Sequence, residues 1–569
     1  MTTSVGAPAL AARDNQIDRL ASERFDLLVV GGGITGAGTA LDAASRGLRV
    51  ALVERDDIAV GTSSRSGKLI HGGLRYLEHL RFGLVREALS ERHRLLRLAP
   101  HLVHMEPFLF PVFGSLLAVP YYGAGLALYD LLGAARDGGR TRFLSARAAR
   151  SRSPALRGEG LRGAFLYHDA VEDDARFALA VARTAGRQGA VVVTRCRAVE
   201  VIAASGRAAG VRVRDELAGR ELDAAAGAVV DATGHWAMDG GGPFAGVGAP
   251  VMPSSGVHLV VPRERIPSEL GLTIRVPGRI IFLIPWGRFW LLGTTDVPYA
   301  GSPDRPAPSA DEIDYLLDHA NHALGVRLGS EDIVAAFSGI RPLASDPTAR
   351  STVRASREHR ILVRDDGLVS VRGGKYTTYR LMARDAVDAA LGPAGRRAPS
   401  RTADLPLAGA LPRSPLAALA VGLTERFALS AATARHLIGR HGADAGELLE
   451  LGSRHDLLRP LVGGLEYLEA EVAWAVQEEL ALSLDDVLSR RLHVAIETPD
   501  HGASVAARVA AIMAPALGWD GARREAEVTR YLAGVAQEYG VPGAGPARGR
   551  APGVAQAGRP STAGSSVPS

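Results

Sequence analysis

A glycine-rich turn between two apolar runs constrains the fold of this 569-residue chain more than any other feature. Gly31-Gly32-Gly33-Ile34-Thr35-Gly36 follows the run Phe25 to Val30 and opens the alanine-rich segment Ile34 to Arg46. A second apolar run, Arg49 to Val53, comes next, so the segment predicts a strand–helix–strand unit. In that context the spacing G-x-G-x-x-G predicts a dinucleotide-binding turn.

Each part of this turn has a separate physical role. Gly31 permits the tight turn, Gly33 lets a pyrophosphate approach the backbone, and Gly36 lets the helix pack closely on the strand. The helix N-terminus supplies free N–H groups and the positive end of its dipole. Glu54, after the second strand, can accept both ribose hydroxyls, which disfavours the 2′-phosphate of NADP. FAD and NAD share this pattern, so the turn alone does not choose between them.

Two later segments resemble further strands that lead into glycine turns. Ala228 to Val230 precedes Asp231-Ala232-Thr233-Gly234, and Leu368 to Val371 precedes Arg372-Gly373-Gly374-Lys375. A cofactor fold assembled from distant segments requires insertions, which should form a second domain. Between them, the region Val251 to Ala336 alternates in the manner of β-strands, most clearly at 257–261 and 280–284.

The two ends of the chain differ from this α/β pattern. A proline-rich linker between Pro393 and Leu407 precedes helix-like segments at 415–426, 431–442, 468–480, 504–514 and 523–539. From Val541 onward Gly, Pro, Ser and Ala dominate, which predicts a disordered tail. The first 22 residues lack the apolar core of a signal peptide and suggest a loose arm.

Charge and cysteine content exclude several classes of protein. The net charge is +5 with no Lys/Arg block long enough for a nucleic-acid-binding arm, so we expect no nucleic-acid partner. A mildly basic surface suits an anionic substrate or membrane face. The single cysteine, Cys196, cannot form an internal disulfide or a cysteine metal cluster, and such a low cysteine content is typical of a protein in a reducing cytosol. We interpret Cys196 as an ordinary residue of a strand. No zinc motif, Ser–His–Asp set or P-loop is present, and we expect no metal.

One uncharged stretch is long enough to span a bilayer by residue count. Pro107 to Tyr129 contains 23 residues without a charge. It also contains three prolines and three glycines, and an interrupted helix would leave backbone groups unpaired in lipid. We therefore expect this stretch to be buried or interfacial and not membrane-spanning.

The segment Thr62 to Glu78 is rich in hydroxyl side chains and glycines, and its sequence is characteristic of one protein family. The chain resembles bacterial FAD-dependent glycerol-3-phosphate dehydrogenases. Five stretches carry the resemblance: Gly31 to Gly38, Lys68 to Glu78, Gly293 to Val297, Ser338 to Leu343, and Gly373 to Arg380. After Ala232-Thr233-Gly234 the family usually has proline, where this chain has His235.

The resemblance implies an α/β architecture. It is a glutathione-reductase-type FAD-binding Rossmann fold with an inserted β-rich substrate domain and a C-terminal all-helical domain. The expected boundaries are a flexible arm at 1–22, an FAD-binding domain at 23–105, 165–250 and 336–392, a substrate domain at 106–164 and 251–335, a linker at 393–407, a helical domain at 408–540 and a disordered tail at 541–569.

The resemblance also implies an activity and a location. The expected reaction is oxidation of sn-glycerol 3-phosphate to dihydroxyacetone phosphate, with a hydride passing from C2 to flavin N5 and electrons then passing to a membrane quinone. The expected protein is a homodimer in the cytoplasm, attached peripherally to the inner face of the cell membrane.

The site residues that the resemblance implies fall into three groups. The catalytic ones are His258, Arg341 and Lys375. The substrate-binding ones are Arg75, Tyr76, Arg357 and Thr377. The cofactor-binding ones are Gly31, Gly32, Gly33, Ile34, Thr35, Gly36, Glu54, Arg55, Thr62, Ser63, Ser64, Lys68, Leu69, His71, Gly72, Val199, Ala232, Thr233, Gly234, Gly339, Gly374 and Lys375.

Elementary chemistry agrees with these groups. A phosphomonoester carries about two negative charges, and arginine forks are suited to binding it. A lone histidine in an apolar run, such as His258, is more often a core residue, yet it is the better candidate for a base that must be neutral near pH 7. Lys375 occupies a predicted helix N-terminus, where the positive end of the helix dipole repels a cation. A role in binding flavin or substrate would explain why a lysine is found there.

Three alternatives remain open. A glycerol-3-phosphate oxidase would share every motif and use oxygen as acceptor. An amine or amino-acid oxidase of the same fold would need a carboxylate clamp and an amine pocket. A non-catalytic FAD-binding sensor would use the C-terminal helices to bind a partner, and its flavin would not be reduced by the substrate.

Overall fold

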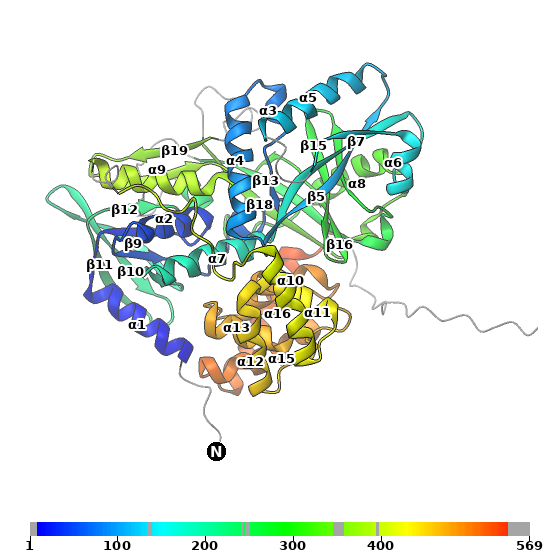
Figure 1. Cartoon of the computed structure of the whole chain (residues 1–569). Coiled ribbons are helices and arrows are strands. Elements are labelled where there is room, and N and C mark those ends of the chain that lie inside the picture. The colour runs from blue at the N-terminus through cyan, green and yellow to red at the C-terminus, as the bar shows by residue number, and fades with distance from the viewer. Residues whose placement is uncertain are drawn as a thin grey trace, which may run out of the picture.

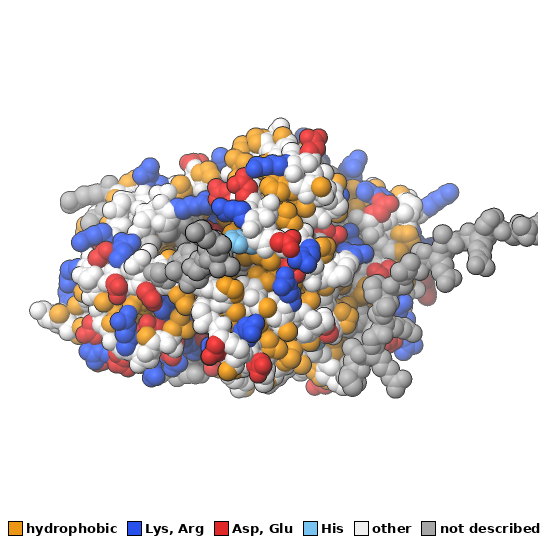
Figure 2. Space-filling model, turned by 90° about the horizontal axis from the view of Figure 1, so that it is seen from below, with side chains coloured by type: hydrophobic (Ala, Val, Ile, Leu, Met, Phe, Trp, Pro, Cys, Tyr) orange, Lys and Arg blue, Asp and Glu red, His pale blue; other side chains and the backbone are white. Residues whose placement is uncertain are grey.

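The computed structural model describes residues 8–133, 139–239, 243–244, 251–344, 358–393 and 398–543. Two β-sheet regions lie side by side, and the C-terminal helices pack together beneath them (Figure 1). Basic and acidic side chains are interspersed on the face seen in Figure 2, without a broad field of either sign.

The first region is a six-stranded sheet assembled from the distant segments that the sequence predicted. Its order is β19-β20-β12-β2-β3-β8, and β19 alone runs antiparallel to its neighbour. The strands are β2 (Leu27–Val30), β3 (Val50–Val53), β8 (Val191–Val193), β12 (Val229–Asp231), β19 (His359–Val363) and β20 (Val369–Gly373). Helices α2 (Ile34–Ser45), α7 (Asp174–Arg187) and α9 (Tyr379–Leu391) pack against this sheet. The central strands are covered on both faces, which explains why they appear as continuous apolar runs.

A smaller sheet and an N-terminal helix extend this region. The sheet contains β1 (Arg24–Phe25), β11 (Arg220–Ala226), β10 (Arg207–Asp215) and β9 (Cys196–Ala204), in that order. Helix α1 (Pro8–Ser22) shows that the prediction of a loose arm was wrong for residues 8–22. Ile17 and Leu20 are fully buried, and Arg13 forms a buried ion pair with Asp215 at 2.8 Å. Apolar residues three apart on one face of a helix give it a surface to bury.

The second region is a ten-stranded sheet with the order β17-β13-β16-β15-β14-β5-β7-β4, in which β18 also pairs with β13 and β6 with β7. The strands are β4 (Leu69–Ile70), β5 (Val103–Phe113), β6 (Arg142–Ser145), β7 (Leu161–Glu172), β13 (Val251–Pro262), β14 (Gly271–Val276), β15 (Arg279–Trp286), β16 (Phe289–Gly293), β17 (Val297–Pro298) and β18 (Ala335–Ala344). Helices α6 (Ala146–Arg152) and α8 (Ala310–Ala323) pack against this sheet. The sheet crosses the predicted domain limits at 165 and 336, because β7 and β18 pair along most of their lengths with β5 and β13.

The uncharged stretch at 107–129 divides into two elements. Its first half lies in β5, where Phe108, Leu109, Phe110 and Val112 are buried. Its second half enters α5 (Ala118–Leu132), which lies beside α3 (Arg75–Glu78) and α4 (Phe82–Leu98) (Figure 1). Leu126 and Tyr129 of α5 are buried, and the rest of the helix is partly buried or exposed. Among the described residues, no helix is both long and apolar enough to cross a membrane.

The C-terminal region is helical as predicted. Its helices are α10 (Arg413–Phe427), α11 (Ala431–His441), α12 (Ala445–Arg454), α13 (Glu469–Glu478), α14 (Val494–Glu497), α15 (Ala503–Leu517) and α16 (Gly521–Tyr539), with a π-helical turn, η9, at Asp486–Arg491. The sequence did not predict α12, α14 or η9. Val541 packs against the core, and residues 544–569 of the predicted tail lie outside the described residues.

Candidate active site

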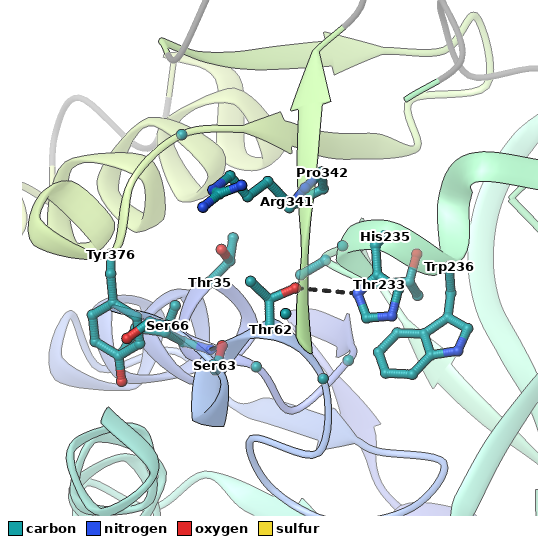
Figure 3. Close-up of a pocket in the computed structure, with 18 of the residues that line it drawn as sticks. Thr35, Thr62, Ser63, Ser66, Thr233, His235, Trp236, Arg341, Pro342 and Tyr376 are labelled. Carbon is teal, nitrogen blue, oxygen red and sulfur yellow. Dashed lines mark hydrogen bonds between the residues drawn. The ribbon is translucent and has the colours of Figure 1, made fainter. Parts of the chain in front are cut away.

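A cavity of about 870 Å³ opens where the two sheet regions meet. Its floor comes from three turns at the carboxyl ends of β2, β12 and β20, where ligands bind in open α/β sheets. The ten-stranded sheet contributes His258 on β13 and Gly339 and Arg341 on β18. In Figure 3 Tyr376 lies on one side of Thr35 and Ser63, His235 and Trp236 lie on the other, and Arg341 lies above them. Thus the segments that the sequence singled out converge on one space.

The glycines of the first turn have the surroundings expected of a dinucleotide site. A Cβ on Gly36 would overlap the carbonyl of Gly31, so α2 can approach β2 only with glycine there. Gly31 has φ +108°, in the region that favours glycine. A Cβ on Gly33 would meet only the Ser63 hydroxyl, at 3.2 Å, so this position faces the cavity. Ile34 N–H donates to Ser63 Oγ at 2.9 Å at the helix N-terminus.

Glu54 lies at the edge of this turn and lines the cavity. Its carboxylate accepts from the N–H groups of Gly32 at 2.5 Å and Asp56 at 2.7 Å. Burial raises the pKa of Glu54 to about 7, against the lowering effect of these two hydrogen bonds. A ribose hydroxyl donating to Glu54 would therefore stabilise its ionised form.

His258 also lines the cavity and is nearly completely buried. Its ring stacks on Phe337 with centroids 5.1 Å apart, and its Nδ1 has no hydrogen-bond partner among the described residues. Burial, together with the charges of Arg341 and Lys68, lowers the pKa of His258 to about 3. A Cβ on Gly67 would stand 3.3 Å from His258 Nε2, so the glycine leaves space between this nitrogen and the cavity. Burial therefore favours the neutral imidazole over the protonated one.

Cationic side chains line the same cavity. Arg341 donates to the Ser255 carbonyl and the Thr294 hydroxyl, both at 3.1 Å, and it lines the cavity. Lys375 Nζ lies 3.7 Å from the centroid of the Tyr76 ring. Thr377 accepts from the N–H of His71 at 3.4 Å. These groups could bind an anion beside a neutral base.

Most of the predicted site residues line the cavity. They are Gly31, Gly33, Ile34, Thr35, Glu54, Arg55, Thr62, Ser63, Leu69, His71, Tyr76, Ala232, Thr233, Gly234, His258, Gly339, Arg341, Gly374, Lys375 and Thr377. Gly32 and Gly36 lie within the turn but do not line the cavity. The side chain of Arg75, at the start of α3, and all of Arg357 lie outside the described residues.

Four predicted cofactor residues lie elsewhere. Lys68 is buried in an ion pair with Asp174, with Nζ 5.0 Å from the centroid of the Trp286 ring, so its charge is used inside the protein. Gly72 donates its N–H to the Tyr129 hydroxyl at 2.7 Å. Ser64 Oγ faces the Gly61 carbonyl at 3.4 Å. Val199 is exposed on β9, where Arg197 and Ala198 supply the cavity wall instead.

Sequence reasoning missed several lining residues, among them Arg65, Trp236, Arg372 and Tyr376. Arg372 pairs with Asp231 at 2.6 Å and so joins the two glycine turns. Arg65 pairs with Glu538 near the end of α16. Both arginines lay inside motifs already noted, but nothing local to the chain identified their partners.

Comparisons with known proteins agree with this geometry. Residues 26–380 match the family described as FAD dependent oxidoreductase, and residues 400–524 match the C-terminal domain of alpha-glycerophosphate oxidase. The chain is 44% identical over 534 residues to a glycerol-3-phosphate dehydrogenase of Mycobacterium leprae (strain TN), covering 92% of this chain and 90% of that protein. It is 37% identical over 535 residues to the mitochondrial glycerol-3-phosphate dehydrogenase of Homo sapiens, covering 89% and 72%.

A solved structure shares the whole arrangement. The glycerol-3-phosphate dehydrogenase of Bacillus halodurans, in complex with FAD, is 27% identical and has a TM-score of 0.76. The similarity covers 92% of this chain and 97% of that one, so it includes the helical C-terminal region as well as the two sheets.

Proposed function

This chain belongs to the family of FAD-dependent glycerol-3-phosphate dehydrogenases, and on that basis we propose that it oxidises sn-glycerol 3-phosphate to dihydroxyacetone phosphate and passes the electrons to a membrane quinone. The observation that carries the proposal is that His258, Arg341 and Lys375 line the same cavity as the glycine turn and Glu54. A neutral base beside cationic groups suits an anionic alcohol.

The residues of the cavity fit FAD. Gly33 leaves space for a pyrophosphate, and a Cβ at this position would narrow that space. Glu54 lies where a ribose would bind. Tyr76, Gly374 and His258 line the same cavity, and its volume of about 870 Å³ leaves space for the second half of an elongated cofactor. When bound, FAD supplies the acceptor for the hydride that leaves C2 of the substrate.

The side chains then have distinct roles in the proposed reaction. A ring nitrogen of His258 takes the proton of the C2 hydroxyl, for which its neutral state is required. Arg341, already oriented by Ser255 and Thr294, stabilises negative charge on the oxygen as that proton leaves. Lys375 and Thr377 complete the polar surface of the cavity, and Arg75, Tyr76 and Arg357 are proposed to bind substrate.

Anaerobic titration tests the reaction directly. Glycerol 3-phosphate added to the purified FAD-loaded protein without oxygen should bleach the visible flavin absorbance, while unphosphorylated glycerol should bleach it far more slowly. A flavin that stays oxidised at saturating glycerol 3-phosphate would contradict the proposal and favour a non-catalytic sensor.

A glycerol-3-phosphate oxidase is the second candidate, because the match at residues 400–524 is to a domain described from alpha-glycerophosphate oxidase. Both activities share the reductive half-reaction and differ only in the acceptor. Peroxide formed in proportion to substrate, without added quinone, would identify the oxidase. Reoxidation that requires quinone would identify the dehydrogenase.

An exposed apolar surface around α5 supports peripheral attachment to a membrane. Leu116, Leu117, Tyr121 and Leu131 are each at least 60% exposed, and Leu80 of the loop before α4 is 72% exposed. Large apolar side chains at a surface favour an interface with lipid. Leu117→Glu with Tyr121→Glu should weaken sedimentation with anionic vesicles, whereas Val421→Glu, at an exposed site on α10, should not. Equal binding by the wild type, the double variant and Val421→Glu would place the membrane contact elsewhere.

We also propose that the protein is a homodimer in solution, and light scattering measures its mass.

A further inference from the structure

A group of hydrogen-bonded side chains lines the cavity beside Glu54. Arg55 follows Glu54 directly, and His235 and Trp236 lie in the short 3-10 helix η2 (Gly234–Asp239) after β12. All three residues line the cavity. If FAD binds as proposed above, its ribose lies at Glu54, and this corner borders the adenosine half of the cofactor.

Both ring nitrogens of His235 have partners on different parts of the chain. Nε2 lies 2.9 Å from the Pro303 carbonyl and must donate, because a carbonyl oxygen only accepts. Nδ1 lies 3.2 Å from the Thr62 hydroxyl oxygen and, because the ring proton is on Nε2, can only accept, so the Thr62 hydroxyl proton is shared between Nδ1 and the Ile340 carbonyl, which lies at 2.5 Å (Figure 3). His235 therefore connects the loop after β3 to the segment 299–305, which joins β17 to α8.

Trp236 makes a second connection to the same segment. Its Nε1–H donates to Asp304 Oδ1 at 2.7 Å, and the same oxygen accepts from Arg55 Nη2 at 2.7 Å. The Arg55 guanidinium carbon lies 5.1 Å from the Trp236 ring centroid, and His235 stacks on Trp236 at 4.0 Å. A Cβ on Gly61 would lie 2.7 Å from the indole, so the two rings pack directly on this glycine.

We propose that Arg55, His235 and Trp236, held by Pro303 and Asp304, form a latch that keeps the adenosine corner shut and slows the dissociation of FAD. The contacts join the six-stranded sheet region to a segment of the ten-stranded sheet region, so widening this corner breaks all three hydrogen bonds to residues 303 and 304. Asp304 has a side chain 57% exposed, which allows the latch to open without unfolding either core.

The rate of FAD release tests the latch independently of turnover. Purified FAD-loaded protein is diluted into buffer without FAD, and the rise of free-flavin fluorescence is followed. Asp304→Ala and Trp236→Phe should each accelerate release by roughly tenfold, the usual effect of losing a hydrogen bond to a charged group. The logarithm of the acceleration in the double variant should be smaller than the sum of the logarithms for the two single variants. The reason is that both changes remove the same Trp236–Asp304 contact.

Asp223→Ala is the matched control. Its carboxylate is 55% exposed and paired with Arg212 at 2.8 Å, but it lies on β11 and does not line the cavity. Release at the wild-type rate from both Asp304→Ala and Trp236→Phe would overturn the latch, and so would equal acceleration by Asp223→Ala. His235→Ala removes both ring contacts and should also release FAD faster. A wild-type protein that binds no FAD would instead contradict the proposed function.

Discussion

At the scale of single residues, His258 is the side chain whose surroundings say most about the chemistry. His258→Ala should lower the limiting rate of flavin reduction by about 10²–10⁴-fold, the usual contribution of a positioned acid–base group. Substrate affinity and FAD content should change little, because Arg341 and the glycine turns are untouched. Stopped-flow reduction with substrate titration separates the two parameters. His319→Ala on α8, away from the cavity, is the control. Reduction at the wild-type rate would move the proton acceptor to Lys375.

Arg341→Ala should instead affect both parameters. Its guanidinium can bind the anionic substrate and stabilise the oxygen that loses its proton, and loss of a charge-assisted hydrogen bond typically costs about 10- to 150-fold. We therefore expect weaker binding and slower reduction in the same stopped-flow experiment. A variant with normal affinity and a reduced rate alone would assign the phosphate to other groups, with Arg75 and Arg357 the next to test.

The pH dependence follows from the burial of His258. Its pKa is lowered to about 3, so a base with this pKa stays neutral as the pH falls below the ordinary histidine value of about 6.5. At saturating substrate, the limiting rate of reduction should stay flat from about pH 8 to about pH 5, and should fall only as the pH approaches the lowered pKa. Saturation is needed because the substrate phosphate itself titrates near pH 6. An acidic limb near pH 6.5 in this limiting rate would contradict the neutral, desolvated histidine.

At the scale of elements, the sequence predicted the buried parallel strands and the main C-terminal helices but not α1. Buried strands are continuous apolar runs, and a glycine turn after each one fixes its end, so β2, β12 and β20 were recognisable in isolation. The apolar face of α1 is short, because it consists of Ile17 and Leu20, which are fully buried, and Leu10, which is partly buried. The domain limits near β7 and β18 failed for another reason: strand pairing over long distances sets them, and no local pattern records it.

Helix α1 supplies the prediction at this scale. Ile17 is fully buried, so Ile17→Ala should lower the free energy of unfolding by about 2–5 kcal/mol through lost burial and the cavity left behind. Asp14→Ala, on the exposed side of the same helix, should change it by a few tenths of a kcal/mol at most. Urea unfolding followed by circular dichroism measures both. Equal stability of the two variants would return residues 8–22 to the loose arm that the sequence suggested.

At the scale of the whole molecule, buried ion pairs join the C-terminal helices to the cofactor-binding region. Arg176 pairs with Glu479 at 2.6 Å, and Arg195 pairs with Asp486 at 2.7 Å. The sequence could reveal a helical domain after the linker, because several of its helices, such as α16, are amphipathic. It could not reveal how that domain docks, because the partners are charged residues that normally belong to a solvated surface. The same limit hid Lys68, whose motif predicted a ligand but whose charge is paired internally with Asp174.

Asp57 is the centre of this docking and gives the last prediction. It is fully buried three residues after Glu54, and its two oxygens accept from Arg490 at 2.6 Å and from Arg491 at 2.8 and 2.9 Å. Asp57→Asn would place an amide N–H₂ against guanidinium N–H groups and leave Arg491 without its nearest carboxylate. Breaking a buried pair from one side costs about 3–5 kcal/mol. Calorimetry of the FAD-loaded protein should therefore show a lower-temperature transition for the C-terminal helices. Asp56→Asn, next in the chain but 37% exposed, should melt like wild type. A single unchanged transition in Asp57→Asn would mean that this carboxylate does not hold the domain, and that the other buried ion pairs and the apolar packing against α13 and α15 are sufficient.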